Sequence, residues 1–315
     1  MRYINTFNDG DNITGIYLCK QRNSAVTKNG KEYENIELAD KSGTIQGKIW
    51  DPGSMGIGDF SVYDYIEIHG RVSLFNGAMQ ISVDRAFKAN EGSFDPADYV
   101  PVTPKDRDML WNTVLCYIDS IETPCYNALL KKIFIEDAEI SESFRMHSAA
   151  KQVHHGFIAG LMHHTVMVAN ICDFLASQYP KLNRDLLITA ALLHDIGKTR
   201  ELSDFPRNDY TDEGQLVGHI VIGTAIIYEK AKEIPDFPAI KKNELVHCIL
   251  AHHGEYEYGS PKLPALMEAI ALTHADNTDA KLEIMNELFE ANEIKGDEWL
   301  GFNKFLSSNI RRTSK

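Results

Sequence analysis

Histidine and aspartate residues occupy apolar positions in several segments of helical period. In the stretch LLHDIGK, His194 and Asp195 directly follow two leucines. His164 falls in the gap of an apolar series between residues 157 and 175, which places it on the buried stripe of that helix. Buried ionisable groups are costly unless something pairs with them. Three further residues continue the apolar faces of their own segments: His219, His252 and Asp276.

A shared metal centre explains these residues together. A single buried histidine is usually a core residue bonded to a carbonyl, but here the pattern recurs on five segments and includes two carboxylates. Imidazole and carboxylate ligands without thiolate suit Mn, Fe, Ni, Zn or Mg. One ion would hardly use the whole set, whereas two ions that share a bridging carboxylate would. Two ions about 3.5–4 Å apart can hold a phosphate and lower the pKa of a bound water, which is the chemistry of phosphodiester hydrolysis.

The segments that carry these residues predict one all-α domain. Apolar residues recur with helical period after residue 105, and Gly197 and Gly254 stand where helix C-termini are expected. We therefore expect a helical domain over residues 106–315. Its basic C-terminal stretch KFLSSNIRRTSK could contact nucleic acid or form a frayed tail. The expected helices lie within six ranges: 129–137, 156–176, 185–197, 218–234, 239–254 and 264–288.

The first ninety residues contain short β-rich segments instead. Five such segments predict a small all-β barrel of the OB type, with a small sandwich as the alternative. We expect this barrel domain over residues 1–90 and a linker over 91–105, which holds three prolines. The expected strands are 12–21, 32–40, 43–51, 64–75 and 78–86, separated by turn signals that include Asn76-Gly77.

An OB barrel often binds single-stranded nucleic acid by stacking bases on aromatic side chains. Tyr33, Trp50 and Phe75 are available for such contacts, although most aromatic residues of a small barrel belong to its core. The net charge of −13 argues against simple polyanion binding, but it is uneven. Residues 1–90 hold 10 Lys and Arg against 11 Asp and Glu, and residues 91–315 hold 22 against 34. A nucleic acid therefore fits the N-terminal part better.

Composition and cysteine spacing predict a soluble cytoplasmic protein. The five cysteines are scattered without CxxC spacing, as expected for reduced thiols. The N-terminal stretch lacks the apolar run of a signal peptide, and no apolar stretch is long enough to span a bilayer. The oligomeric state stays open, with an oligomer possible.

The order of these residues resembles that of a known family. His164, His194-Asp195 and Asp276 are similar to the H…HD…D signature of the HD-domain metal-dependent phosphohydrolases. A subgroup of that family binds a second metal through further histidines. This chain has such histidines in GHIVIG and HHGEYEYGSPKLP, namely His219, His252 and His253.

Nearly the whole chain resembles the YhaM-type 3′→5′ exoribonucleases, which combine an OB fold with an HD domain. The stretches ELADKSGTIQGKIWD, GRVSLFNGAMQI and AAKQVHHGFIAGLMHHT carry this resemblance. It implies manganese-dependent trimming of single-stranded RNA, and often DNA, from the 3′ end to nucleoside monophosphates. His163 stands where the family pattern has an acidic residue, so either His163 or His164 could be the ligand; the helical face favours His164.

The resemblance also implies a role for each ligand. One metal would take His164, His194, Asp195 and Asp276, and Asp195 would bridge to a second metal held by His219 and His252, with His253 as a further ligand or substrate contact.

Four other residues have less specific roles. Lys198 could reach a phosphate oxygen or could be a solvated lysine. His154 and His155 could contact the substrate, support a ligand or be structural, and Asp279 could orient Asp276 or a metal-bound water or be a surface charge.

Two other functions use the same residues. The first is an HD phosphohydrolase of nucleotides or cyclic dinucleotides with a regulatory barrel, and the second is a non-catalytic nucleic-acid adaptor. The appended barrel favours the nuclease over the first, because a mononucleotide hydrolase does not need it. The complete ligand set argues against the adaptor.

Overall fold

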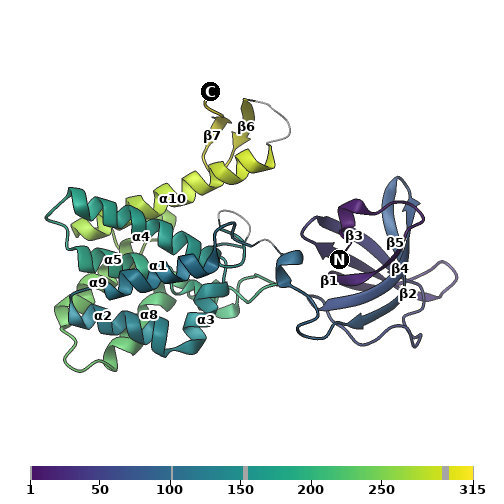
Figure 1. Cartoon of the computed structure of the whole chain (residues 1–315), viewed down its shortest axis with the longest axis horizontal. Helices are drawn as coiled ribbons and strands as arrows, with labels where there is room; N and C mark the ends of the chain where they lie inside the picture. The colour runs from purple at the N-terminus through teal and green to yellow at the C-terminus, as the bar shows by residue number, and fades with distance from the viewer. Residues whose placement is uncertain (1, 101, 152–154, 293–297, 315) are drawn as a thin grey trace. The chain divides into compact units, whose positions relative to one another are not determined.

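The chain folds into two compact units, Met1–Pro101 and Val102–Lys315 (Figure 1). The computed structural model describes residues 2–100, 102–151, 155–292 and 298–314. Within these ranges, every helix is too short or too polar to traverse a lipid bilayer.

Five strands form a closed barrel in the first unit. Around the barrel the order is β1-β2-β3-β5-β4, in which β3 and β5 are parallel and the other neighbours antiparallel. This topology confirms the expected OB-type barrel. The strands are β1 (Asn12–Val26), β2 (Glu32–Asp40), β3 (Gly43–Ile49), β4 (Tyr65–Phe75) and β5 (Ala78–Lys88).

Alternation of side chains along the strands fills the barrel. Along β4, Ile66, Ile68, Gly70 and Val72 are buried while the residues that alternate with them are partly buried or exposed. Burial of each isoleucine or valine side chain contributes about 1.5–3 kcal/mol. Asn76 and Gly77 join β4 to β5 with φ values of 50° and 81°, as the tight hairpin turn requires.

The segment expected as a linker is shared between the two units. The ring centroids of Phe94 and Tyr99 lie 4.1 and 5.0 Å from that of Tyr65 in β4. The backbone amide of Lys41 also donates to the Asp98 carbonyl at 2.8 Å. These contacts explain why the barrel unit extends past residue 90.

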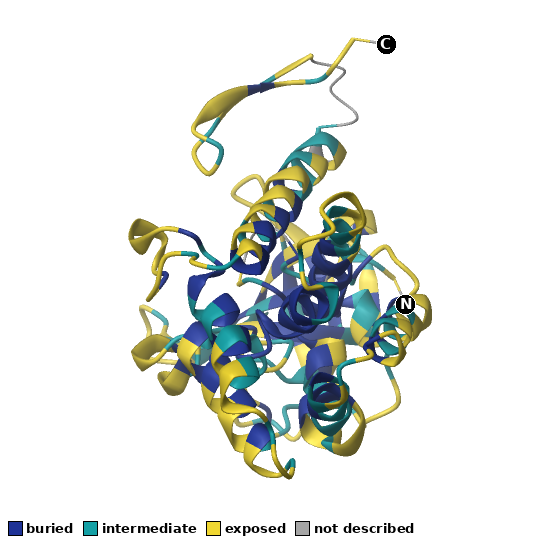
Figure 2. Cartoon of the chain, turned by 90° about the vertical axis from the view of Figure 1, so that its left-hand side faces the viewer, coloured by how far each residue is buried: buried dark blue, intermediate teal, exposed yellow. Residues whose placement is uncertain are grey.

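The second unit is helical, and α5 lies at its centre. All residues of α5 from Leu186 to Leu193 are buried, and α5 contacts α1, α2, α4, α9 and α10. Buried residues, dark blue in Figure 2, gather at the centre of this unit. All six expected helical ranges contain a helix. The helices are α1 (Arg107–Asp119), α2 (Pro124–Lys131), α3 (Ala138–Met146), α4 (Gly160–Gln178), α5 (Arg184–Leu193), α6 (Lys198–Glu201), α7 (Asp212–Leu216), α8 (His219–Lys232), α9 (Ala239–Ala251) and α10 (Met267–Ala291).

Helices α1, α3, α6 and α7 and the hairpin of β6 and β7 lie outside the expected ranges. The helices α1 and α3 begin after Asp106 and Asp137, whose carboxylates cap their first turns. Near the C-terminus, β6 (Trp299–Asn303) and β7 (Ser308–Arg311) pair as an antiparallel hairpin where a continued helical pattern or a frayed tail was expected.

Candidate metal centre

Helices α4, α5 and α10 bring together the first cluster of ligand-type atoms. The Nε2 atom of His164 lies 3.1 Å from Nε2 of His194 and 3.2 Å from Oδ1 of Asp276. Its neighbour His163 turns away, with Nδ1 3.1 Å from the Thr103 hydroxyl. Burial lowers the pKa of His163 to about 4, with a further contribution from the His155 imidazole. His164 is thus the histidine that faces the cluster.

The second cluster lies at the start of α8 and the end of α9. Ligand-type atoms of His219, His252 and His253 all lie within 4.8 Å of one another. His252 donates from Nδ1 to the Ile249 carbonyl at 2.7 Å, which leaves Nε2 free to accept. Burial and neighbouring imidazoles lower the pKa values of His252 and His253, so both are neutral at pH 7, as metal ligands must be.

The carboxylate of Asp195 lies between the two clusters. Its Oδ2 atom is 3.3 Å from His194 Nε2 and 3.5 Å from His164 Nε2. Its Oδ1 atom is 3.5 Å from His219 Nε2 and 3.8 Å from His252 Nε2. Although burial favours the neutral acid, Lys198 and these histidines hold the pKa of Asp195 well below its usual range. Asp195 is therefore an anion whose two oxygens face different clusters.

Three buried atoms of this group have no hydrogen-bond partner among the described residues. They are Oδ1 of Asp195, Nε2 of His219 and Nε2 of His252. Unpaired buried polar atoms are costly, and a cation would satisfy all three. Ligand atoms about 2.0–2.2 Å from one ion lie roughly 3–4 Å apart, as these do. The residues therefore fit a divalent metal, and the absence of thiolate favours a metal that accepts nitrogen and oxygen ligands.

Two carboxylates support the histidines from behind. Asp279 accepts a hydrogen bond from His164 Nδ1 at 2.6 Å, and Glu201 accepts one from His219 Nδ1 at 2.9 Å. Burial disfavours protonation of His164, but the carboxylates of Asp276 and Asp279 outweigh it and raise its pKa to about 10. Asp279 was expected to orient Asp276 or a metal-bound water, or to be a surface charge, and Glu201 was not predicted at all.

A tight turn between α5 and α6 presents the His194-Asp195 pair. Gly197 in this turn follows the end of α5, where a helix C-terminus was expected, and has an ordinary φ of −64°. It is needed for close approach, because a Cβ at this position would lie 2.0 Å from the His219 carbonyl oxygen. The absence of a side chain thus allows α8 to bring His219 toward Asp195.

A cavity of about 370 Å³ opens onto the two clusters. Lys198 lines it, with Nζ 2.7 Å from Asp195 Oδ2. Burial opposes its charge, but the Asp195 carboxylate raises the pKa of Lys198, so the amine is cationic. The lining also includes His253, Tyr258 and Asn277.

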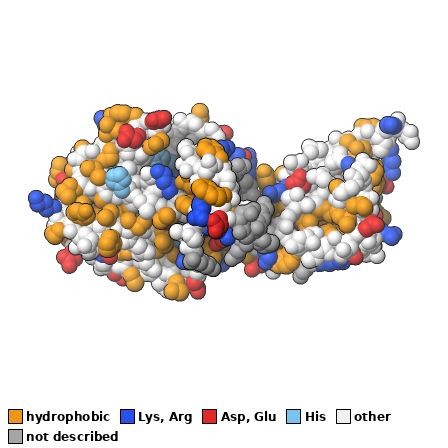
Figure 3. All heavy atoms as spheres, turned by 90° about the horizontal axis from the view of Figure 1, so that it is seen from above, with side chains coloured by type: hydrophobic (Ala, Val, Ile, Leu, Met, Phe, Trp, Pro, Cys, Tyr) orange, Lys and Arg blue, Asp and Glu red, His pale blue; other side chains and the backbone are white. Residues whose placement is uncertain are grey.

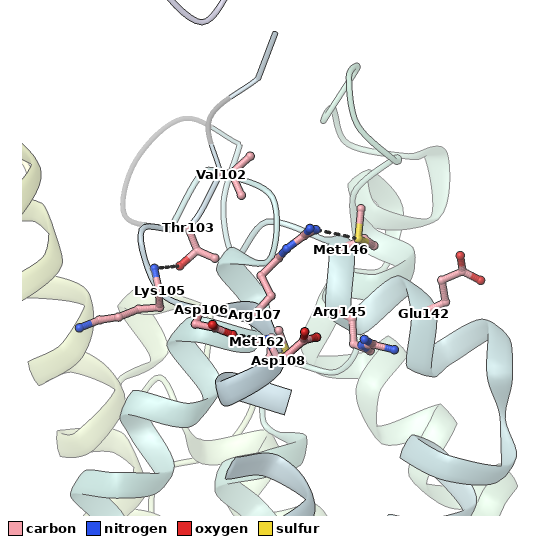
Figure 4. A pocket seen from close by; sticks show the side chains of 10 residues that line it. All are labelled: Val102, Thr103, Lys105, Asp106, Arg107, Asp108, Glu142, Arg145, Met146 and Met162. Atoms are coloured by element: carbon pink, nitrogen blue, oxygen red, sulfur yellow. Dashed lines mark hydrogen bonds between the residues drawn. The ribbon is translucent and has the colours of Figure 1, made fainter. Parts of the chain in front are cut away.

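A larger cavity, of about 610 Å³, lies at the start of the second unit (Figure 4). Its lining has no imidazole among the described residues. Size alone therefore does not identify the reactive cavity. The charged side chains around it are Lys105, Arg107, Arg145, Asp106, Asp108 and Glu142.

Comparisons with known proteins agree with this site. A family model described as "HD domain" matches residues 161–281. The 3′-5′ exoribonuclease YhaM of Bacillus velezensis is 32% identical over 284 residues, which cover 89% of this chain and 88% of that protein. The protein of the same name from Bacillus subtilis strain 168 is 31% identical over 285 residues, with the same coverage. The chain belongs to the YhaM family of 3′-5′ exoribonucleases. Membership confirms the family and the class of enzyme predicted from the sequence, a hydrolytic exonuclease.

Solved structures resemble parts of this YhaM family member. The HD domain of the Listeria monocytogenes phosphodiesterase PgpH covers 51% of this chain and 86% of its own, with a TM-score of 0.30 and 19% identity. The second OB-fold domain of replication protein A from Methanococcus maripaludis covers 30% of this chain and 98% of its own, with a TM-score of 0.24 and 20% identity.

Of the histidine pair before the HD domain, the structure describes His155, which is not an exposed substrate contact. His155 is fully buried, and its Nε2 atom lies 2.9 Å from Asp279 Oδ2. It therefore supports the carboxylate behind His164, which was one of the roles expected for it. His154 lies outside the described residues.

The three aromatic residues expected to bind nucleic acid line one groove of the barrel. The rings of Tyr33 and Trp50 stack with centroids 5.2 Å apart, and Phe75 is 62% exposed. Lys48 adds a positive charge 5.1 Å from the Tyr33 ring centroid. The groove has a volume of about 360 Å³ and also contains Ser73, Gln80 and Ser82.

Proposed function

We propose that this YhaM family member binds two manganese ions and hydrolyses the terminal phosphodiester of single-stranded RNA from the 3′ end, releasing nucleoside monophosphates. Family membership supports the reaction and its direction. The observation that carries the metal pair is the position of Asp195, whose two oxygens face separate clusters. Its Oδ1 and the Nε2 atoms of His219 and His252 are buried without a hydrogen-bond partner among the described residues.

In this proposal each cluster holds one ion and Asp195 belongs to both. Bound ions would supply positive charge to the phosphate and lower the pKa of a water molecule. The mixed imidazole and carboxylate set is compatible with manganese, as it is with iron, nickel, zinc or magnesium. The first ion would take His164, His194 and Asp276, and the second would take His219, His252 and His253.

Lys198 would bind the scissile phosphate from the protein side. Its amine is cationic, lines the cavity and is 14% exposed, so a phosphate oxygen can reach it. A charge-assisted hydrogen bond to that oxygen would orient the phosphate toward Asp195. The enclosing helices would exclude bulk water, which strengthens these interactions.

The barrel groove would hold the strand upstream of its 3′ end. Stacked rings bind bases without sequence preference, and Lys48 would face the backbone phosphate. Such a groove also accepts DNA, so we propose single-stranded DNA as a second substrate. Cytoplasmic RNA turnover agrees with the five free cysteines, Cys19, Cys116, Cys125, Cys172 and Cys248.

The test is the hydrolysis of a 5′-labelled RNA oligonucleotide by the purified protein in a series of divalent metals. We expect a ladder that shortens from the 3′ end with Mn²⁺ present, and nucleoside monophosphates as products. Asp195→Ala should abolish the ladder while circular dichroism shows an unchanged fold.

A protein that leaves oligonucleotides intact but hydrolyses nucleotides or cyclic dinucleotides would contradict the proposal. It would instead support the small-molecule phosphohydrolase. A 3′-phosphorylated oligonucleotide and a fully paired duplex serve as controls for end recognition and strand state.

A further inference from the structure

The C-terminal hairpin exposes two large aromatic rings. Trp299 is 62% exposed and Phe302 is 68% exposed, both in β6. The hairpin stands at the end of α10 and is mostly exposed (Figure 2). An isolated two-stranded hairpin is marginally stable, and clustered exposed apolar side chains usually mark an interaction surface.

A register shift between Trp299 and Gly301 puts both rings on one face of the hairpin. Trp299 pairs with Arg311, and Phe302 pairs with Asn309. Directly paired residues point to the same side of a sheet, as do residues two apart in one strand. The four side chains therefore share a face. Ile310, between the two β7 members, points to the other side, where it is 6% exposed.

This face carries two aromatic rings, a guanidinium group and a side-chain amide. The Arg311 guanidinium carbon lies 5.8 Å from the Trp299 ring centroid, and the guanidinium also pairs with Glu298. Over residues 298–314 there are three basic residues and one acidic residue, in a chain whose net charge is −13. Elsewhere Lys and Arg side chains are interspersed with apolar and acidic ones on the face shown in Figure 3. The hairpin thus concentrates ring faces and positive charge.

We propose that the hairpin face of Trp299, Phe302, Asn309 and Arg311 is a second platform for single-stranded RNA. Exposed rings beside a guanidinium are the pattern that binds unpaired bases by stacking and cation–π contact. The local positive charge is complementary to the phosphate backbone of a polyanion such as RNA. This inference rests on the proposed function, because it takes the same RNA to be the ligand.

The test compares Trp299→Ala and Phe302→Ala with a matched control, Phe174→Ala, which removes a ring that is 63% exposed on α4. Affinity of the full-length, metal-free proteins for a labelled 20-nucleotide RNA is measured by fluorescence anisotropy. We expect each hairpin variant to raise Kd by about 5- to 150-fold, the range of one lost base stack. The control should match wild type, and so should turnover of a dinucleotide with Mn²⁺ by both hairpin variants.

A second readout reports on the platform directly. The chain has three tryptophans, so Trp50→Phe with Trp111→Phe leaves only Trp299. Its fluorescence should be quenched when RNA binds. Absence of quenching, or hairpin variants with wild-type Kd, would overturn the inference.

Sedimentation distinguishes the other occupant, a second copy of this chain. If the hairpin substitutions dissociate an oligomer of the wild-type chain but leave its RNA affinity unchanged, the hairpin binds a second copy and the inference is overturned. If wild type degrades RNA and these results are obtained, only the platform fails. If wild type neither binds nor degrades RNA, the proposed function fails with it.

Discussion

At the scale of single residues, two carboxylates fix the imidazoles that face the metal cavity. Asp279 holds Nδ1 of His164, and Glu201 holds Nδ1 of His219. An imidazole that donates from Nδ1 presents its Nε2 lone pair to a metal, and its orientation is fixed by the same bond. One histidine of each cluster therefore has a carboxylate behind it.

Loss of either supporting carboxylate should weaken metal binding. We expect Asp279→Ala and Glu201→Ala each to reduce Mn²⁺ affinity by about 10- to 100-fold. Isothermal titration of the metal-free protein measures this without reference to activity. Glu229→Ala, which removes an exposed carboxylate from α8, is the control and should bind as wild type. Equal affinities in all four proteins would contradict these roles.

Metal affinity should also rise with pH. The pKa of His164 is raised to about 10 in the metal-free site, so the imidazole carries a proton at neutral pH that a metal must displace. Each displaced proton makes the affinity change about tenfold per pH unit. Titrations between pH 6 and 8 should show this slope, with proton release into the buffer. A pH-independent affinity would contradict protonation of His164.

The sequence predicted which histidines and aspartates face inward better than it predicted the carboxylates that bond to them. His164, His194 and Asp276 lie on apolar helix faces, and periodicity finds such positions. Glu201 lies in α6, which has four residues and is too short to show an apolar period. Its contact with His219 is tertiary and joins residues 18 apart in the sequence. Asp279 was expected to orient Asp276 or a metal-bound water, or to be a surface charge. It is 6% exposed and accepts a hydrogen bond from His164 in α4, a contact between helices that periodicity does not reveal.

At the scale of elements, Gly197 sets the distance between the turn after α5 and the start of α8. Gly197→Ala would put a Cβ 2.0 Å from the His219 carbonyl oxygen and 2.7 Å from the Gly223 nitrogen, both backbone atoms. Overpacking of this kind costs about 1–3 kcal/mol or more. We expect chemical denaturation to show that loss, together with weaker metal binding.

Gly223, which faces Gly197 across this contact, supplies the control substitution. A Cβ at Gly223 would have its nearest neighbour at 3.4 Å, the Gly197 nitrogen. Gly223→Ala should therefore preserve stability, because α8 also gains a better helix former. Equal losses in the two variants would show that the crowding at Gly197 does not control this packing.

Elements with a strong period were predictable, and the C-terminal hairpin was not. The five barrel strands and six helical ranges follow clear apolar patterns. In β6 the register shift near Leu300 breaks the alternation of a strand, and β7 has only four residues. The C-terminal boundary of the barrel unit was also not predictable from sequence. It depends on the packing of Phe94 and Tyr99 on Tyr65, which are distant in the sequence.

At the scale of the whole molecule, we propose that the barrel groove binds the strand while the cavity of the helical unit hydrolyses it. Trp50→Ala should raise the KM for a long RNA by about 5- to 150-fold, the range expected from lost base stacking. The kcat/KM for a dinucleotide should stay unchanged, because that substrate needs only the metal cavity. Tyr179→Ala, which removes a ring that is 57% exposed in the helical unit, is the control. A matching loss on both substrates would contradict this division.

The most direct test of the account is the number and coupling of Mn²⁺ ions bound per chain, measured by titration and electron paramagnetic resonance. The position of Asp195 between two clusters predicts two ions with a spin-coupled spectrum. Asp195→Ala should lose the coupling together with the RNA ladder. A single ion with an uncoupled spectrum in the active wild-type protein would contradict the bridging role of Asp195.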